Sequence, residues 1–311
     1  MRIAILDDYQ RIALRLADWT AVQTRAEVKV FDRHLSEVEA AAELRDFDVL
    51  CFLRERMAMP RSLIERLPNA KFFSITGPHH RTLDTAAAEE RGIRLAYAEG
   101  PPGTDGTTEL AWGLIIALSR HLAVEIPAMR QGAWQTTYGR RLRGQTLGLV
   151  GLGRLGSHMA AIGKAFGMEV IAWSQNMTAA SASDAGATHV TKDQLFARSD
   201  FVSLHVVLSE RTRHLVGRRE LDLMKPDAFL VNTARAGLVD TDALLDTLRG
   251  NRIGGAAIDV FEEEPLSPSH PLRGLNNVLL TPHLGYTTED NLRAFYEGTV
   301  KNVTAYLDGK L

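Results

Sequence analysis

The chain has 311 residues, 45% of them hydrophobic and 24% charged, which is typical of a folded protein of about two domains and excludes a small disulfide-stapled scaffold. Its 36 basic and 38 acidic residues give a formal net charge of −2, so no excess of cations favours nucleic acid or an anionic membrane as a partner. The only cysteine, Cys51, excludes an intramolecular disulfide, and the first residues show no secretory signal pattern. We therefore expect a cytoplasmic protein.

The first hundred residues alternate short β-rich runs with helical stretches. The runs lie at residues 3–6, 28–31, 49–53 and 72–75. Such alternation predicts a parallel α/β layer. Two glycines and two prolines at 100–103 then interrupt the pattern, and we place the end of a first domain, residues 1–100, at this break.

The same alternation returns in the second half of the chain, where helices are predicted at 109–119, 157–166 and 288–307. Six β-rich runs lie at 146–150, 169–172, 201–204, 229–232, 255–258 and 278–281. Six strands separated by helices predict a doubly wound parallel sheet, and we assign residues 101–283 to this second domain. Because no strand follows the last predicted helix, we expect residues 284–311 to pack on the first domain.

A glycine-rich turn follows the first of these six runs. Gly151, Gly153 and Gly156 form a G-x-G-x-x-G pattern between a predicted strand and a predicted helix. In this context Gly151 permits the tight turn, Gly153 lets the backbone approach a pyrophosphate, and Gly156 allows close packing of the helix on the strand. The amides at the helix start, those of Arg154 and Leu155, are predicted to hold the phosphates. The alternative is a glycine-rich turn that binds no ligand.

Three charged or titratable residues follow later strands of the same domain. Arg235 follows the run that ends at residue 232, Glu264 follows the next run, and His283 follows the last one. In an open parallel sheet the carboxyl ends of the strands form the edge where ligands bind, so these side chains can converge on one substrate. Taken singly, each has an ordinary alternative role: a surface arginine, one of three solvated glutamates, and a loop histidine held by backbone hydrogen bonds.

Four ordered motifs resemble one enzyme family. They are the glycine pattern, Asn232-Thr233-x-Arg235, Asp259-Val260-Phe261-x-x-Glu264-Pro265 and Thr281-Pro282-His283. Their order and spacing over essentially the whole chain resemble the D-isomer-specific 2-hydroxyacid dehydrogenases, and in particular the glyoxylate and hydroxypyruvate reductases. The resemblance implies a Rossmann nucleotide-binding domain at 101–283, a flavodoxin-like substrate domain formed by 1–100 and 284–311, and an active site in the cleft between them.

The resemblance also implies a reaction and a set of roles. A hydride passes from C4 of a reduced nicotinamide to the carbonyl carbon of a small 2-keto acid, and the developing oxyanion needs a proton and a cationic partner. His283 would supply the proton, Glu264 would orient its imidazole and favour the protonated form, and Arg235 would bind the substrate carboxylate and polarise the carbonyl. Thr233 and Asp259 would bind the cofactor, Asp259 through the nicotinamide carboxamide. The alternative is a non-catalytic nucleotide-sensing protein, because the family resembles certain transcriptional corepressors that keep this fold.

The first domain departs from the family pattern at two loops. Arg54 follows the third β-rich run, and Gly77 lies in the loop 76–81, where many members of the family have a glycine-rich substrate loop. We infer that Arg54 and Gly77 bind the carboxylate or a polar tail of the substrate; the alternative is that both loops are simply solvated. We expect no metal, because His79 and His80 are adjacent, so their side chains point apart, and no third ligand stands at a suitable spacing.

The end of the second strand of the nucleotide-binding domain bears on the choice of cofactor. NAD-specific members of the family place Asp or Glu there to bind the ribose 2′-hydroxyl, whereas this chain has Ser174, Gln175 and Asn176. A hydroxyl and two amides can donate hydrogen bonds to a 2′-phosphate, which a carboxylate would repel. We therefore predict that both NAD and NADP are used, with NADP modestly favoured.

Aromatic residues on and after the predicted helix at 109–119 bear on assembly. Trp112, Trp134 and Tyr138 lie in a stretch that members of the family use as an exchange arm, and large aromatic side chains are common in interface cores. We predict a homodimer with these three residues at its interface. The alternative is that the rings pack within their own domain.

Overall fold

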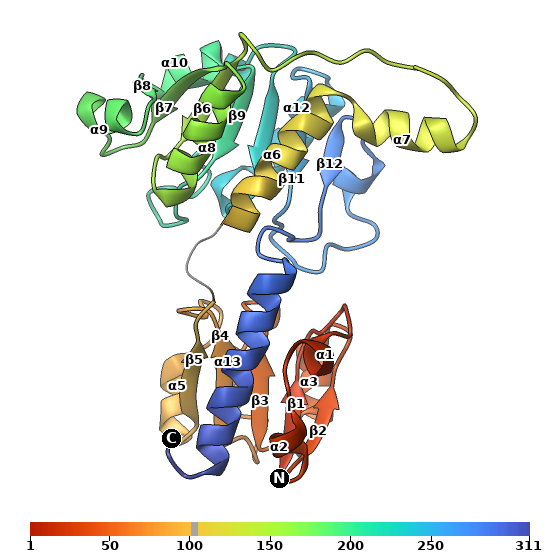
Figure 1. Cartoon of the computed structure of the whole chain (residues 1–311), viewed down its shortest axis with the longest axis vertical. Helices are drawn as coiled ribbons and strands as arrows, with labels where there is room; N and C mark the ends of the chain where they lie inside the picture. The colour runs from red at the N-terminus through yellow and green to blue at the C-terminus, as the bar shows by residue number, and fades with distance from the viewer. Residues whose placement is uncertain (101–104) are drawn as a thin grey trace. The chain divides into compact units, whose positions relative to one another are not determined.

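The computed structural model describes residues 1–100 and 105–311, and the chain divides into two compact units (Figure 1). Unit 1 contains Met1–Gly103 and Thr287–Leu311, and unit 2 contains Thr104–Tyr286. The predicted domains, 1–100 with 284–311 and 101–283, place the boundary three residues earlier at each crossing. Pro101, Pro102 and Gly103, on which the predicted break partly rested, lie outside the described residues.

Unit 1 is built on a five-stranded parallel sheet in the order β2-β1-β3-β4-β5. The strands are β1 (Arg2–Ile5), β2 (Glu27–Val30), β3 (Val49–Phe52), β4 (Phe72–Thr76) and β5 (Arg94–Ala98). This is the strand order of flavodoxin-like sheets, so the predicted fold class of this unit is confirmed. The sequence predicted the first four strands within one residue at each end but missed β5, because this edge strand exposes Arg94 and Tyr97 and has no continuous apolar run.

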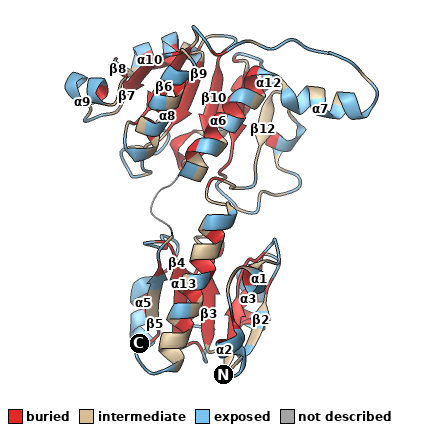
Figure 2. Cartoon of the chain, in the orientation of Figure 1, coloured by how far each residue is buried: buried red, intermediate tan, exposed pale blue. Residues whose placement is uncertain are grey.

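The helices of unit 1 form two groups. They are α1 (Ala13–Leu16), α2 (Thr20–Gln23), α3 (Glu37–Glu43), α4 (Arg61–Ile64), α5 (Thr85–Glu90) and α13 (Glu289–Leu307). Helix α4 packs on its chain neighbours α3 and α5, whereas α13 packs on β4, β5, α1 and α2. The long C-terminal helix belongs to unit 1 and buries Phe295, Tyr296 and Val303. Figure 2 shows the central strands of the sheet as fully buried.

Unit 2 is built on a seven-stranded parallel sheet in the order β12-β11-β10-β9-β6-β7-β8. The strands are β6 (Thr146–Val150), β7 (Glu169–Trp173), β8 (Thr188–His189), β9 (Phe201–Leu204), β10 (Phe229–Asn232), β11 (Gly255–Ile258) and β12 (Val278–Leu280). Counted from β6, this is the Rossmann order with one added strand, and it reverses between β6 and β9. Six of the seven strands were predicted. The sequence missed β8, because its two exposed residues give no hydrophobic pattern.

In unit 2, two helices precede β6 and the other helices connect the strands. The helices are α6 (Asp105–Ser119), α7 (Leu122–Arg130), α8 (Arg154–Ala165), α9 (Ala179–Asp184), α10 (Lys192–Arg198), α11 (Arg218–Leu223) and α12 (Thr241–Arg249), with short 3₁₀ turns η1 (Ala236–Leu238) and η2 (Pro271–Gly274). The apolar side chains of α6, including Ala111, Leu114 and Ile115, lie in the core against the sheet. Within the described residues no single helix is long and apolar enough to cross a membrane; α6 and α7 meet these limits only as a pair bent by 68°.

The three aromatic residues predicted at an interface lie in different environments. Trp112 is only 4% exposed and packs on Phe166, with the ring centroids 5.0 Å apart. The prediction for Trp112 is therefore wrong, because its position on α6 turns the ring into the core of its own unit. Trp134 and Tyr138, by contrast, follow α7 and are 74% and 92% exposed.

Candidate active site

The glycine-rich turn lies between β6 and α8, where the order of the sheet reverses. Gly151 has a φ of +98°, and a Cβ atom there would lie 2.8 Å from the backbone oxygen of His205, so this position requires glycine. A Cβ atom on Gly156 would collide with the backbone oxygen of Gly151, and its absence lets α8 pack directly on the turn. A Cβ atom on Gly153 would meet no atom within 4 Å, so the turn is open at that position.

The start of α8 presents backbone amides that no side chain caps at this open position. The helix begins at Arg154, three residues before the predicted start, because it includes the second half of the glycine motif. Gly153 is its N-cap and offers no side chain to the first amides, among them those of Arg154 and Leu155. Helix-start amides of this kind bind phosphate groups. The turn is therefore shaped to receive the pyrophosphate of a dinucleotide.

His205 closes the other side of the glycine turn. It follows β9, and its Nε2 atom lies 2.9 Å from the hydroxyl of Ser203. Burial lowers the pKa of His205 to about 4. The imidazole is thus neutral at pH 7 and adds no charge beside the turn.

The three polar residues expected to read the cofactor ribose lie next to this turn. The amide of Gly151 donates to the backbone oxygen of Trp173 at 2.9 Å, which joins the turn to the end of β7. Ser174, Gln175 and Asn176 follow directly; Ser174 is half-buried and the two amide side chains are exposed. All three are therefore accessible where a ribose 2′-group binds in Rossmann domains.

Arg235 is held at the end of β10 by a local turn. The Asn232 side chain accepts a hydrogen bond from the Ala234 amide at 3.1 Å and donates one to the Arg235 carbonyl at 3.0 Å. The Arg235 guanidinium donates to the Ala234 carbonyl at 2.7 Å and is half-buried. Thr233, in the same turn, is 6% exposed, and its hydroxyl has no hydrogen-bond partner in the described part of the chain. This hydroxyl lies at the same edge of the sheet as the glycine turn. A buried hydroxyl without a partner at that edge is suited to bind a polar group of a nicotinamide dinucleotide.

Asp259 lies at the end of β11 and is completely buried. Its carboxylate accepts hydrogen bonds from the Thr281 hydroxyl at 2.6 Å and from the amides of Leu284 and Gly285 at 2.7 and 3.0 Å. Burial raises the pKa of Asp259, while these three donors act in the opposite direction. All three contacts are made to the segment that carries His283, so in this structure Asp259 organises that segment.

Glu264 and His283 form a direct pair. The Nδ1 atom of His283 lies 2.6 Å from Oε2 of Glu264, and the other carboxylate oxygen accepts from the Phe261 amide at 2.9 Å. Because a carboxylate only accepts, Nδ1 carries the shared proton. His283 has a φ of +54°, in the left-handed region, and its ring makes a T-shaped contact with Tyr286, with the ring centroids 5.4 Å apart. The pairing expected from the resemblance is thus present.

The three residues of the predicted triad follow three adjacent strands. β10, β11 and β12 are neighbours in the sheet and parallel, so the segments that carry Arg235, Glu264 and His283 leave the same edge. The Asp259 amide donates to the Asn232 carbonyl, and the Thr281 amide to the Ile258 carbonyl, each at 3.0 Å. These bonds extend the ladder to the start of each segment and hold the segments side by side.

Arg54 and Gly77 are in contact at the edge of the sheet in unit 1. The Arg54 amide donates to the Thr76 hydroxyl at 2.6 Å, and its guanidinium lies 5.8 Å from the centre of the Phe295 ring. Gly77 has a φ of +89°, and a Cβ atom there would collide with the Arg54 guanidinium. The glycine therefore makes room for the arginine.

The histidine pair in the loop after β4 is divided between surface and core. His79 is exposed, whereas His80 is 5% exposed and packs edge-on against Phe52 at 5.5 Å. Burial lowers the pKa of His80. The expectation that this loop is either solvated or ligand-binding is wrong for His80, which is a core residue. The sequence alone does not show which of the two adjacent histidines is buried.

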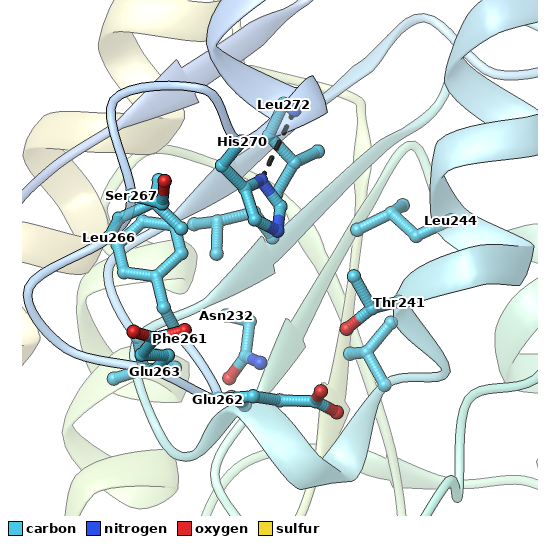
Figure 3. Close-up of a pocket in the computed structure, with 14 residues that line it drawn as sticks. Asn232, Thr241, Leu244, Phe261, Glu262, Glu263, Leu266, Ser267, His270 and Leu272 are labelled. Carbon is cyan, nitrogen blue, oxygen red and sulfur yellow. Dashed lines mark hydrogen bonds between the residues drawn. The ribbon is translucent and has the colours of Figure 1, made fainter.

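A small cavity lies beside the triad in unit 2 (Figure 3). It has a volume of about 160 Å³ and lies between the segment after β10 and the loop 260–272. Its lining includes Asn232, Thr241, Phe261, Glu262 and His270. The Nδ1 atom of His270 accepts from the Leu272 amide at 3.3 Å. Because pockets for organic ligands span roughly 300 to 1,000 Å³, this cavity is too small for a dinucleotide.

The sequence did not point to Thr107, whose hydroxyl supports the His283 segment, and it gave Thr281 no role beyond its place in the Thr281-Pro282-His283 motif. The Thr107 hydroxyl donates to the Gly285 carbonyl at 2.8 Å across 178 residues of sequence. Only the folded chain brings Thr107 to this position.

Comparison with known proteins identifies relatives of the chain. Residues 112–285 match the family described as "D-isomer specific 2-hydroxyacid dehydrogenase, NAD binding domain". A glyoxylate reductase of Aeropyrum pernix is 38% identical over 260 residues, which cover 80% of this chain and 77% of the relative. A hydroxypyruvate reductase of Thermotoga maritima is 34% identical over 298 residues, 94% of each chain. The crystal structure of a phosphoglycerate oxidoreductase from Vibrio cholerae superposes with a TM-score of 0.93 over 99% of both chains at 35% identity.

Proposed function

Because the chain belongs to the D-isomer specific 2-hydroxyacid dehydrogenase family, we propose that its substrate is a small 2-keto acid of the glyoxylate or hydroxypyruvate type. Membership makes the chain a nicotinamide-dependent oxidoreductase that interconverts 2-keto and 2-hydroxy acids. The relatives from Aeropyrum pernix and Thermotoga maritima, a glyoxylate reductase and a hydroxypyruvate reductase, support the choice of substrate. The observation that carries the proposal is the 2.6 Å pair of Glu264 and His283 at the sheet edge that also carries Arg235.

We assign each member of the triad a role that follows from its contacts. Glu264 engages Nδ1 of His283, so Nε2 is the ring nitrogen that delivers a proton to the substrate oxygen during reduction. Arg235 binds the substrate carboxylate, because a guanidinium forms two parallel hydrogen bonds with a carboxylate. The bound nicotinamide supplies the hydride. In the reverse direction, the neutral His283 accepts the proton of the 2-hydroxyl group.

The cofactor is held, in this proposal, by the glycine turn and the residues near it. Gly151, Gly153 and Gly156, with the amides of Arg154 and Leu155, bind the pyrophosphate, and Thr233 binds the nicotinamide half. Ser174, Gln175 and Asn176 face the ribose 2′-group, with NADP modestly favoured over NAD. Arg54 and Gly77, in contact in unit 1, remain the candidates for binding the far end of the substrate.

We also propose that the chain forms a homodimer through α7 and the segment that follows it. No residue of α7 is buried. Ile126, Met129, Trp134 and Tyr138 are all at least half exposed. Large apolar side chains gathered on one exposed segment are typical of an interface.

The substrate proposal is tested with a panel of 2-keto acids. Oxidation of NADH and NADPH is followed with glyoxylate, hydroxypyruvate, pyruvate and 2-ketoglutarate, and with a simple ketone as the control that lacks a carboxylate. We expect glyoxylate or hydroxypyruvate to give the highest kcat/KM, on the order of 10⁴ M⁻¹s⁻¹ or more, and the ketone to give no turnover. Tight cofactor binding without turnover of any acid would instead favour a nucleotide sensor.

A further inference from the structure

Hydrogen bonds from two residues hold the turn that carries His283. The carboxylate of Asp259 accepts from the Thr281 hydroxyl and from the amides of Leu284 and Gly285. The hydroxyl of Thr107, in the first turn of α6, donates to the Gly285 carbonyl at 2.8 Å. The turn is thus tied to two elements of unit 2, the end of β11 and the start of α6.

Gly285 fits closely between these two supports. A Cβ atom on Gly285 would lie 3.2 and 3.3 Å from the hydroxyl oxygen and the methyl carbon of Thr107, and 3.4 Å from a carboxylate oxygen of Asp259. The backbone of Gly285 therefore makes a hydrogen bond to each side: its amide donates to Asp259 and its carbonyl accepts from Thr107. The turn has little room to shift while both bonds are intact.

The conformation of His283 makes such support necessary. A φ of +54° is unfavourable for a residue with a Cβ atom, and unfavourable backbone conformations persist only when their surroundings hold them. The 2.6 Å contact between His283 and Glu264 depends on this conformation. If the Gly285 carbonyl is released, the turn can relax and the imidazole moves relative to Glu264.

We propose that Thr107 is a positioning residue for His283, acting through the Gly285 carbonyl. The proposal rests on the role given above to His283 as proton donor. Thr107 and Gly285 lie near opposite ends of the sequence of unit 2, so their hydrogen bond also joins the two ends of that unit. The hydroxyl fixes the proton donor without touching the reacting atoms.

The neighbouring residue offers a matched control. Thr108 is 2% exposed on the same helix, and its hydroxyl has no hydrogen-bond partner in the part of the chain that the structure describes. Thr107→Val and Thr108→Val each remove one hydroxyl from α6 and keep nearly the same shape. Thr107→Ser keeps the hydroxyl and removes only a methyl group.

Kinetics with the best substrate of the panel form the first part of the test. In Thr107→Val we expect kcat to fall roughly 10- to 100-fold, because small displacements of a catalytic group have effects of this size, with KM and the cofactor Kd within about threefold of wild type. Thr107→Ser should recover kcat to within about threefold, and Thr108→Val should match wild type. Unchanged kcat in Thr107→Val, an equal loss in Thr108→Val, or no recovery in Thr107→Ser would overturn the proposal.

A second measurement does not depend on turnover. The proton on Nδ1 of His283, shared with Glu264, should give a downfield resonance in the NMR spectrum, assigned by its loss in His283→Asn. We expect this resonance in wild type, Thr107→Ser and Thr108→Val, and its loss or broadening in Thr107→Val. A sharp resonance at the wild-type position in Thr107→Val, or no such resonance in wild type, would contradict the proposal. Failure of the substrate proposal is seen separately, as a wild-type protein that reduces no acid.

Discussion

Ser174 is the residue at which a single change has the clearest expected effect on cofactor choice. It lies directly after β7, beside the glycine turn, and carries no charge. In Ser174→Asp the new carboxylate accepts hydrogen bonds from the ribose 2′-hydroxyl and repels a 2′-phosphate. We expect the ratio of kcat/KM for NADPH to that for NADH to fall roughly tenfold or more, about 1.4 kcal/mol.

The control for this change is Ser183→Asp, which adds the same charge at an exposed position of α9. It should leave the ratio unchanged. The wild-type protein should accept both cofactors, and a preference for NADH of more than about 100-fold would show that these three polar residues do not bind a 2′-phosphate.

Motifs and position after a strand pointed to the triad residues but not to the surroundings of each residue. Arg235, Glu264 and His283 could be found because each follows a strand within a recognisable motif. His80 and Trp112 could not be placed, because their burial depends on Phe52 and Phe166, residues distant in sequence. Thr107 had no signal at all, since its role appears only in a hydrogen bond to Gly285.

In the turn between β6 and α8, we expect Gly156 to determine stability and Gly153 to determine cofactor binding. A Cβ atom on Gly156 would collide with the Gly151 carbonyl, whereas one on Gly153 would meet nothing within 4 Å. Gly156→Ala should therefore lower the free energy of unfolding by about 1–3 kcal/mol through overpacking. Gly153→Ala should leave it within about 0.5 kcal/mol but weaken cofactor binding roughly tenfold, because the new methyl group occupies the space of the pyrophosphate.

Denaturant unfolding and cofactor titration of the two variants check this pair. Equal loss of stability in both variants would show that the open side of the turn is not at Gly153. Unchanged cofactor affinity in Gly153→Ala would show that the pyrophosphate does not bind there.

The loop after β4 makes the stability of unit 1 depend on pH. Burial lowers the pKa of His80 below its ordinary value of 6.5, so between these two values the unfolded chain binds a proton that the folded chain does not. Stability is then complete above about pH 6.5 and falls as the pH decreases. In His80→Gln the decrease in the thermal midpoint between pH 7.5 and pH 5 should be smaller than in wild type.

His189→Gln, at an exposed position of β8, is the control for this pH dependence and should behave like wild type. The comparison uses the change of midpoint with pH, so a loss of packing in His80→Gln does not obscure it. An equally steep pH dependence in wild type and His80→Gln would mean that His80 takes up its proton without opening the loop.

Elements were predicted best where strands are central and buried. β6, β9, β10 and β11 have the predicted bounds, because each is an apolar run bounded by turn residues. The edge strands β5 and β8 were missed, since exposed edge positions tolerate polar residues and leave no hydrophobic pattern. The start of α8 was placed too late, because Gly156 in its first turn has low helix propensity.

The sequence predicted both sheets because alternating strands and helices admit few arrangements. The oligomeric state follows less directly from the sequence than the two sheets do. The exposed side chains of Trp134 and Tyr138 carry the prediction of a homodimer, and the double variant Trp134→Glu, Tyr138→Glu places charges in that interface. Light scattering at micromolar concentration should give a dimer for wild type and a monomer for the variant.

An exposed apolar residue elsewhere provides the control for assembly. Val38, on α3 of unit 1, is 69% exposed, and Val38→Glu should leave the dimer intact. A monomeric wild-type protein would rule out the proposed role of α7 and the segment that follows it.

We propose that His283 donates the proton in a nicotinamide-dependent reduction, and the variant His283→Asn removes that donor. Asparagine keeps a polar side chain of similar reach to Nδ1 but cannot deliver a proton from the position of Nε2. With the best 2-keto acid of the panel, turnover should fall about 10²- to 10⁴-fold, while the Kd for the cofactor stays within about twofold of wild type. Turnover close to that of wild type in His283→Asn would show that His283 is not the proton donor.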